Sequence, residues 1–155
     1  MIVFIDSGVI GKLCNPNPTE KTIAVNEWLF SLLAKGIFVV SSDICDNEVR
    51  RSLILEALRK PNINSIEGLD EIQNLVTFLP LTNNVMKEAA NLWAEARIQV
   101  MPTADDRSLD ADLIICAQYK LLKQEYPGRY IVIATTNVKH LSRFTEAKQW
   151  HEINQ

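Results

Sequence analysis

The chain has 155 residues, 47% of them hydrophobic and 23% charged, which suits one globular domain and excludes a disordered, collagen-like or coiled-coil protein. Its 16 Lys and Arg residues are outnumbered by 19 Asp and Glu residues, which gives a formal net charge of −3. The chain therefore has no overall positive field of the kind that would indicate nucleic-acid binding. A bound metal ion would supply positive charge locally.

The cysteines and histidines form no disulfide or zinc-binding pattern. Cys14, Cys45 and Cys116 are widely spaced, and His140 and His151 are the only histidines. Reduced thiols in the cytoplasm are the simplest interpretation. The N-terminus lacks the basic segment of a signal peptide, and no stretch reaches the ~20 apolar residues that cross a bilayer. We therefore expect a cytoplasmic protein that does not enter a membrane.

Short apolar runs of strand-forming residues alternate with segments of helical periodicity along the chain. In chain order, the first half predicts a strand at 2–5, turns at 6–8 and 15–18, a helix from a cap at Thr19 to Gly36, a strand at 37–40, and a helix from caps at 41–43 to Pro61. The second half predicts a helix at 65–75, a strand at 76–79, a helix capped by Thr82, a loop at 101–108, a helix at 110–126, a strand at 130–134, a short helix, and an edge strand near Trp150.

This alternation is typical of a parallel sheet covered by helices on both faces. The expected fold class is a three-layer α/β/α sandwich with a four- to five-stranded, mainly parallel sheet. No linker, repeat or low-complexity segment interrupts the chain, so residues 1–155 are interpreted as one domain. The C-terminal ends of parallel strands share one edge of the sheet, where such folds bind their ligands.

Five polar residues are expected at that edge. They are Asp6 after the first strand, Glu48 in the helix after the second, Asp110 and Asp112 at the start of the helix before the fourth, and Asn137 after the fourth. Gathered carboxylates repel one another, so a stable cluster implies a cation. Oxygen ligands without Cys or His suit Mg²⁺ or Mn²⁺, and the expected chemistry is metal-assisted attack of water on a phosphodiester.

Each of these residues also has an ordinary structural interpretation. Asp110 and Asp112 would stabilise the first turn of a helix through its dipole, Asp6 would be a turn residue, Glu48 a solvated helix residue, and Asn137 a helix cap. The five structural interpretations are less convincing as a set than one by one, because all five residues would have to meet at one edge by coincidence.

The segments that contain these residues resemble a known family. The first strand with Asp6 and Ser7, and residues 47–51, 109–117 and 133–137, are similar to PIN-domain ribonucleases, above all to the single-domain VapC-type toxins of type II toxin–antitoxin pairs. The resemblance covers nearly the whole chain in order and spacing. The stretch from Asp112 to Ala117 is its most specific part, with Cys116 where the family often has Ala.

The resemblance implies roles for residues of this chain. Asp6, Glu48 and Asp112 correspond to the three acidic residues that serve as catalytic and metal ligands, Asp110 matches an additional acid, and Asn137 takes a fourth position that is Asp in other members. It further implies Mg²⁺- or Mn²⁺-dependent cleavage of RNA, a homodimer, and inhibition by a cognate antitoxin protein. Basic residues near these positions are candidates for contact with RNA phosphates: Arg50, Arg51, Lys139 and Arg143.

Other doubly wound folds fit less well. A haloacid-dehalogenase-type phosphatase needs a second acid two residues after Asp6, where Gly8 stands. A receiver domain needs a phosphorylatable Asp after a central strand, where Ser41 and Ser42 follow Val40. The remaining alternative is a catalytically silent PIN-like module that binds RNA or a protein partner, and phosphodiesterase activity with and without EDTA distinguishes it from the nuclease.

Overall fold

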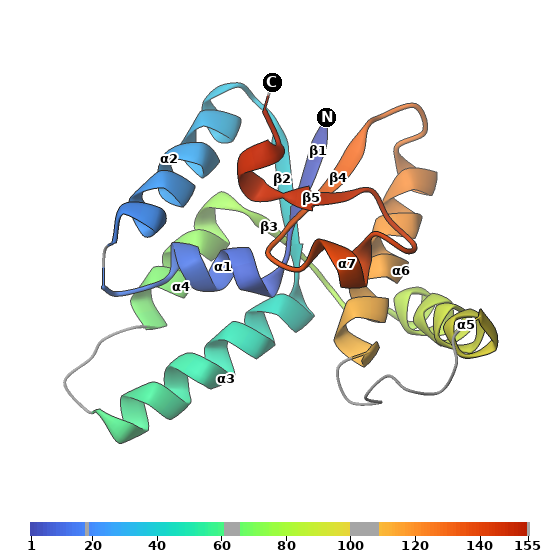
Figure 1. Ribbon diagram of the computed structural model, residues 1–155, viewed down its shortest axis with the longest axis horizontal. Coiled ribbons are helices and arrows are strands. Elements are labelled where there is room, and N and C mark those ends of the chain that lie inside the picture. The colour runs from blue at the N-terminus through green and yellow to red at the C-terminus, as the bar shows by residue number, and fades with distance from the viewer. Residues whose placement is uncertain (18, 61–65, 100–108, 155) are drawn as a thin grey trace.

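The computed structural model describes residues 1–17, 19–60, 66–99 and 109–154 (Figure 1). Five strands form one sheet: β1 (Ile2–Ile5), β2 (Phe38–Ser42), β3 (Thr77–Leu79), β4 (Ile131–Thr135) and β5 (Ala147–Gln149). The helices are α1 (Ser7–Leu13), α2 (Glu20–Ala34), α3 (Asp43–Arg59), α4 (Ile66–Leu75), α5 (Asn83–Gln99), α6 (Leu109–Glu125), α7 (Val138–Leu141) and the 3₁₀ turn η1 (Trp150–Glu152).

All strand pairs of the sheet are parallel, and the strand order is β3-β2-β1-β4-β5. The chain thus builds one half of the sheet from β1 through β2 to β3 and then returns to the other side of β1 for β4 and β5. The reversal lies between β1 and β4, and open parallel sheets bind ligands at the C-terminal ends of the strands that flank such a reversal. In this chain those ends are residues 5–6 and 135–137.

The central strands are buried because helices cover both faces of the sheet. Every residue of β1 and β4 is buried, as expected for apolar strands in the middle of a parallel sheet. Figure 1 shows α1, α2 and α4 to one side of the strands and α5 and α6 to the other. The predicted three-layer α/β/α class with a five-stranded parallel sheet is confirmed. Among the described residues, none of the helices has the length and apolar character needed to cross a membrane.

Three of the predicted helix caps are present. One is Thr82, whose hydroxyl accepts from the Val85 amide at the start of α5. Thr19 forms a reciprocal capping box with Thr22 at the start of α2, and the Ser42 hydroxyl accepts from the Ile44 amide at the start of α3. Gly36 follows α2 with a φ of 69°, a left-handed conformation that favours glycine after a helix. These boundaries are set by a few neighbouring residues, which is why the sequence alone predicts them.

The interpretation of residues 6–8 as a turn is wrong. Helix α1 begins directly after β1, and Asp6 is its N-cap. Two glycines lower the helix propensity of this segment, yet Val9, Ile10 and Leu13 bury one face of α1 in the core. Tertiary packing therefore outweighs a weak local propensity here.

Candidate active site

Asp6 lies at the end of β1, beside the end of β4. Its side chain is only 6% exposed, and each carboxylate oxygen accepts a hydrogen bond. Oδ1 accepts from the Val9 amide at 3.0 Å, and Oδ2 accepts from the Thr135 hydroxyl. The Thr135 hydroxyl in turn accepts from the Asn137 amide at 2.9 Å. Asp6 is thus fixed by both α1 and the chain that leaves β4.

The pKa of Asp6 is raised to about 6, chiefly because burial disfavours the charged carboxylate. The hydrogen bonds from Thr135 and Val9 act in the opposite direction, and the negative charge of Asp112 raises the pKa further. Burial is therefore the main cause, whereas repulsion between carboxylates was the expected one. Because Asp112 affects the pKa of Asp6, this carboxylate of α6 lies near Asp6, as expected from the order of the elements.

Glu48 reaches the same edge from α3. The hydroxyl of Ser7, the residue after Asp6, donates to Glu48 Oε2 at 3.0 Å. Burial raises the pKa of the Cys45 thiol, and the charges of both Asp6 and Glu48 raise it further. Two carboxylates therefore lie close to one thiol, and Glu48 is turned toward the sheet edge rather than being a solvated helix residue.

Asp112 stands in the first turn of α6 and contacts α7. Burial raises its pKa, while the neighbouring His140 lowers it. His140 Nδ1 lies 3.4 Å from Asp112 Oδ2. Asp110, two residues earlier, is exposed and has no hydrogen bond or ion pair to another described residue. Asp112 thus belongs to the cluster of Asp6 and Glu48, whereas Asp110 lies at its outer margin.

Asn137 is the N-cap residue of α7, but its side chain makes no capping hydrogen bond. Its backbone amide, through Thr135, is two hydrogen bonds from Asp6. A helix-capping role therefore does not account for this side chain, which is exposed at the same edge.

Gly8 permits the close approach of α1 to the end of β4. A Cβ atom at this position would lie 2.3 Å from Thr136 Oγ1 and 3.4 Å from Asp6 Oδ1. A side chain here would force the threonine to move. The close approach brings the N-terminus of α1 and the residues after β4 to the same edge.

The donor set suits a hard cation, since it consists of carboxylate, hydroxyl and amide oxygens. In the described part of the chain, however, no three His, Cys, Asp or Glu side chains stand close enough to hold a metal ion as they are oriented. Glu48 is bonded to Ser7 and Asp112 lies against His140. Three-carboxylate coordination would therefore require side-chain rotation, most simply of Glu48 away from the serine hydroxyl.

The residues that position these acids were not singled out as site residues by the sequence analysis. They are Ser7, which binds Glu48, Thr135, which binds Asp6, and His140, which faces Asp112. Each lies within two residues of a predicted site residue in the chain: Ser7 beside Asp6, Thr135 near Asn137 and His140 beside Lys139. This adjacency was the signal available in the sequence.

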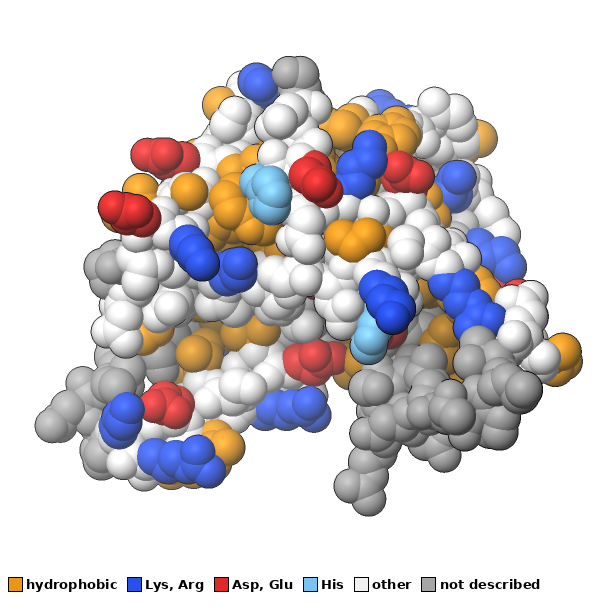
Figure 2. All heavy atoms as spheres, in the orientation of Figure 1, with side chains coloured by type: hydrophobic (Ala, Val, Ile, Leu, Met, Phe, Trp, Pro, Cys, Tyr) orange, Lys and Arg blue, Asp and Glu red, His pale blue; other side chains and the backbone are white. Residues whose placement is uncertain are grey.

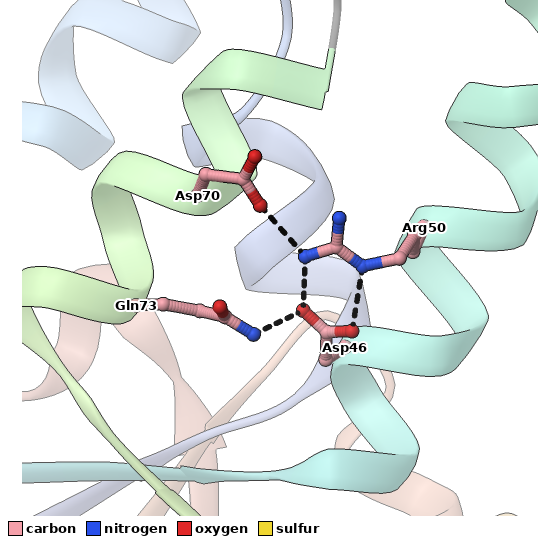
Figure 3. Close-up of polar contacts among 4 residues, drawn as sticks. All are labelled: Asp46, Arg50, Asp70 and Gln73. Atoms are coloured by element: carbon pink, nitrogen blue, oxygen red, sulfur yellow. Dashed lines mark hydrogen bonds and ion pairs between the residues drawn. The ribbon is translucent and has the colours of Figure 1, made fainter.

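The predicted phosphate-binding cations have different environments. Arg50 binds Asp46 through Nε and Nη2 at 2.9 and 3.1 Å and binds Asp70 through Nη2 at 2.9 Å (Figure 3). Gln73 also donates to Asp46, so the four residues join α3 to α4. We therefore assign Arg50 to helix packing rather than to RNA contact.

The other three cations remain on the surface. Arg51 and Lys139 are exposed and have no ion pair to another described residue. Arg143 donates to the neutral Gln99 side chain at 3.1 Å and stacks 5.5 Å from the Phe144 ring centre. Their positive charges are therefore not neutralised by a carboxylate in the described structure.

Compared by sequence, the chain matches no protein-family model and no curated protein. Compared by structure, it is similar to a chain of VapBC2 from Rickettsia felis, in a complex bound to a DNA fragment from the promoter, with a TM-score of 0.67 and 15% identity over 97% of this chain and 99% of that chain. It is also similar to a chain of VapBC-1 from nontypeable Haemophilus influenzae, with a TM-score of 0.64, 20% identity and the same coverage. In each comparison the similarity spans nearly the full length of both chains. The chain therefore has the PIN-domain fold found in VapBC toxin–antitoxin complexes.

Proposed function

We propose that this protein is an Mg²⁺- or Mn²⁺-dependent endoribonuclease and the toxin of a type II toxin–antitoxin pair. The observation that carries the proposal is the buried Asp6 carboxylate at the point where the strand order reverses, with Glu48 hydrogen-bonded to the next residue, Ser7. Asp112 is close enough to raise the pKa of Asp6 further. The three acids come from three separate segments of the chain, near the edge where this sheet topology binds ligands.

In this proposal Asp6, Glu48 and Asp112 hold the metal ion, with Asn137 and Asp110 at the margin. The ion, when bound, would lower the pKa of a water molecule and polarise the phosphodiester. The protein's own groups prepare the site: the Val9 amide and the Thr135 hydroxyl fix the orientation of Asp6. The Ser7 hydroxyl holds Glu48 at the edge, where its carboxylate would be available to the ion.

The proposed partners are RNA as substrate, a cognate antitoxin protein and a second copy of the chain. The similar structures are complexes of VapBC toxin–antitoxin systems, which supports an antitoxin partner. The homodimer rests on the sequence resemblance, and the proposed cytoplasmic location rests on the three widely spaced cysteines.

The direct test is cleavage of a fluorescent oligoribonucleotide by purified protein with MgCl₂, with MnCl₂ or with EDTA. Cleavage should require metal, and Asp6→Asn and Asp112→Asn should each reduce it at least about 100-fold, because loss of a ligand exceeds the 10–100-fold cost of losing a residue that only orients one. The matched control is Glu71→Gln on the exposed face of α4, which should cleave at the wild-type rate. Equal cleavage in EDTA, or by Asp112→Asn, contradicts the proposal.

A catalytically silent binding module is the second candidate. It is favoured by one observation, that no three ligating side chains in the described residues are arranged for a metal ion. Such a module would bind RNA or a partner with and without metal and would show no cleavage under any of the three conditions.

A further inference from the structure

A groove of about 580 Å³ lies between the second half of α6, the start of β4 and the segment that joins α7 to β5. Four cationic side chains are among its lining residues: Lys120, Lys123, Arg129 and Arg143. Glu146 is the one acidic residue among the described lining residues. A concentration of positive charge stands out on a chain whose formal net charge is −3.

Most of this positive charge is not neutralised by neighbouring acids. Lys120 pairs with Glu88 at 2.6 Å, but Lys123 and Arg129 have no ion pair to another described residue. The acidic lining residue, Glu146, is itself paired with Lys148 at 3.5 Å. The groove therefore offers at least two free cations together with Arg143.

Aromatic rings alternate with these cations. Lys123 Nζ lies 5.8 Å from the ring centre of Tyr119, and Arg143 lies 5.5 Å from that of Phe144. Tyr130, directly before β4, is 47% exposed. Lys148 Nζ lies 3.1 Å from its hydroxyl and 5.7 Å from its ring centre, so one part of the ring already carries a cation. Cations that follow a phosphate backbone beside rings on which bases stack are the pattern of single-strand nucleic-acid grooves.

Helix α6 and the segment after α7 link the groove to the acidic edge of the sheet. Helix α6 carries Asp112 in its first turn. Lys120 and Lys123 lie further along the same helix, about 12–17 Å from Asp112 at a rise of 1.5 Å per residue. Arg143 follows α7, whose His140 faces Asp112. Figure 2 shows Lys and Arg side chains gathered over the part of this face where α6, α7 and β5 lie. A strand cleaved at the edge would have to extend about 12–17 Å along α6 to reach Lys120 and Lys123.

We propose that this groove binds the single-stranded RNA segment that flanks the scissile bond, with Lys123, Arg129 and Arg143 contacting phosphates and Tyr130 stacking on a base. The inference rests on the proposed function, because it takes RNA as the substrate. Single-stranded rather than duplex RNA is favoured, since an exposed ring stacks only on bases that are not already stacked in a helix.

The test is equilibrium binding of a fluorescein-labelled single-stranded oligoribonucleotide of about 12 nucleotides, measured by anisotropy in EDTA over a range of salt concentrations. In the double variant Lys123→Gln/Arg129→Gln, two phosphate contacts are lost. The slope of log K against log salt should become shallower by about 1.4, and binding at 0.1 M salt should weaken about 25-fold. Tyr130→Ala should weaken binding at least about fivefold at every salt concentration.

The matched control is Lys21→Gln/Lys35→Gln, in the first turn of α2 and directly after its last residue. It makes the same change of net charge on the other side of the molecule, where Figure 1 shows α2. Its binding should change less than twofold. Three results would overturn the inference: no RNA binding by the wild type, equally weakened binding in both double variants, or unchanged binding in the groove variant. The last result would leave an acidic segment of a protein partner as the occupant.

The binding experiment and the cleavage experiment test the groove assignment and the proposed nuclease separately. Groove-dependent binding without metal-dependent cleavage would contradict the proposed nuclease and leave the groove assignment standing. Metal-dependent cleavage by the wild type, with binding that ignores the groove, would contradict the groove assignment alone.

Discussion

Asp6 has two structural roles besides its proposed function. It accepts the Val9 amide as the N-cap of α1 and accepts the Thr135 hydroxyl at the end of β4. These bonds favour the carboxylate, but burial disfavours it more strongly, so the pKa is about 6 instead of 3.8. The ionised side chain at neutral pH is therefore a local cost to stability, one that a bound cation would reduce.

The sign of this effect gives a prediction for Asp6→Asn. Because the folded pKa is raised, the wild-type carboxyl contributes stability below about pH 3.8 that is lost as the pH rises through about 6. Asparagine keeps an acceptor for the Val9 amide and carries no charge. In EDTA at about pH 7.5 the variant should be more stable by up to about 3 kcal/mol, and this advantage should vanish near pH 4. Urea unfolding at several pH values measures it.

The control is Asp110→Asn, at the exposed first turn of α6. Loss of a carboxylate near a helix N-terminus should lower stability by about 0.3–1 kcal/mol at neutral pH, the opposite sign. If Asp6→Asn is also less stable than the wild type at pH 7.5, its hydrogen bonds outweigh the cost of burying its charge.

At the scale of elements, α3 performs two tasks on different sides. Glu48 faces the sheet edge, whereas Asp46 and Arg50, each two residues away, face α4, where they meet Asp70 (Figure 3). Residues two apart on a helix do not share a side, so the salt-bridge network positions α3 against α4 without occupying the site.

Substitution of Arg50 should therefore affect mainly the stability of the protein, whereas substitution of Arg51 should affect mainly its RNA binding. Arg50→Gln should lower the free energy of unfolding by about 1 kcal/mol, as expected for a partly exposed, bidentate ion pair, with RNA affinity changed less than twofold. Arg51→Gln should leave stability within about 0.5 kcal/mol and weaken RNA binding, since Arg51 is exposed and has no ion pair to a described residue. Denaturant unfolding and RNA anisotropy on both variants separate the two roles; the reverse assignment would return Arg50 to the RNA-binding surface.

For the whole molecule, metal binding should couple to folding. Mn²⁺ at a hundredfold excess over its Kd should stabilise the native state by about 2.7 kcal/mol, which raises the melting temperature of a domain of this size by roughly 5–10 °C. Asp112→Asn should reduce this increment. Asn137→Asp should enlarge it, because a carboxylate binds the ion more strongly than an amide does.

Differential scanning calorimetry with and without Mn²⁺ measures the increment. Asn91→Asp on the exposed surface of α5 adds the same charge away from the sheet edge and should leave the increment unchanged. An undiminished increment in Asp112→Asn would place Asp112 outside the metal site, and equal increments in Asn137→Asp and the wild type would do the same for Asn137.

The sequence by itself determined the features that depend on residues close together in the chain. Apolar runs predicted the first four strands, while the fifth was expected only as an edge strand near Trp150. Thr19 and Ser42 predicted helix starts, and the alternation of strands and helices predicted the parallel sheet. Since parallel strands bring their C-terminal ends to one edge, the prediction that Asp6 and Asp112 lie near each other followed from element order alone.

Tertiary structure decided what depends on contacts between distant segments. Helix α1 forms despite its glycines because its apolar face is buried, and Ser7 binds Glu48 across 41 positions of sequence. Arg50 is drawn away from the site by Asp70, an acid on another helix. The cationic groove likewise joins α6, β4 and the segment after α7. No local pattern encodes these contacts, because side-chain partners and burial are fixed only when the packed chain brings the elements together.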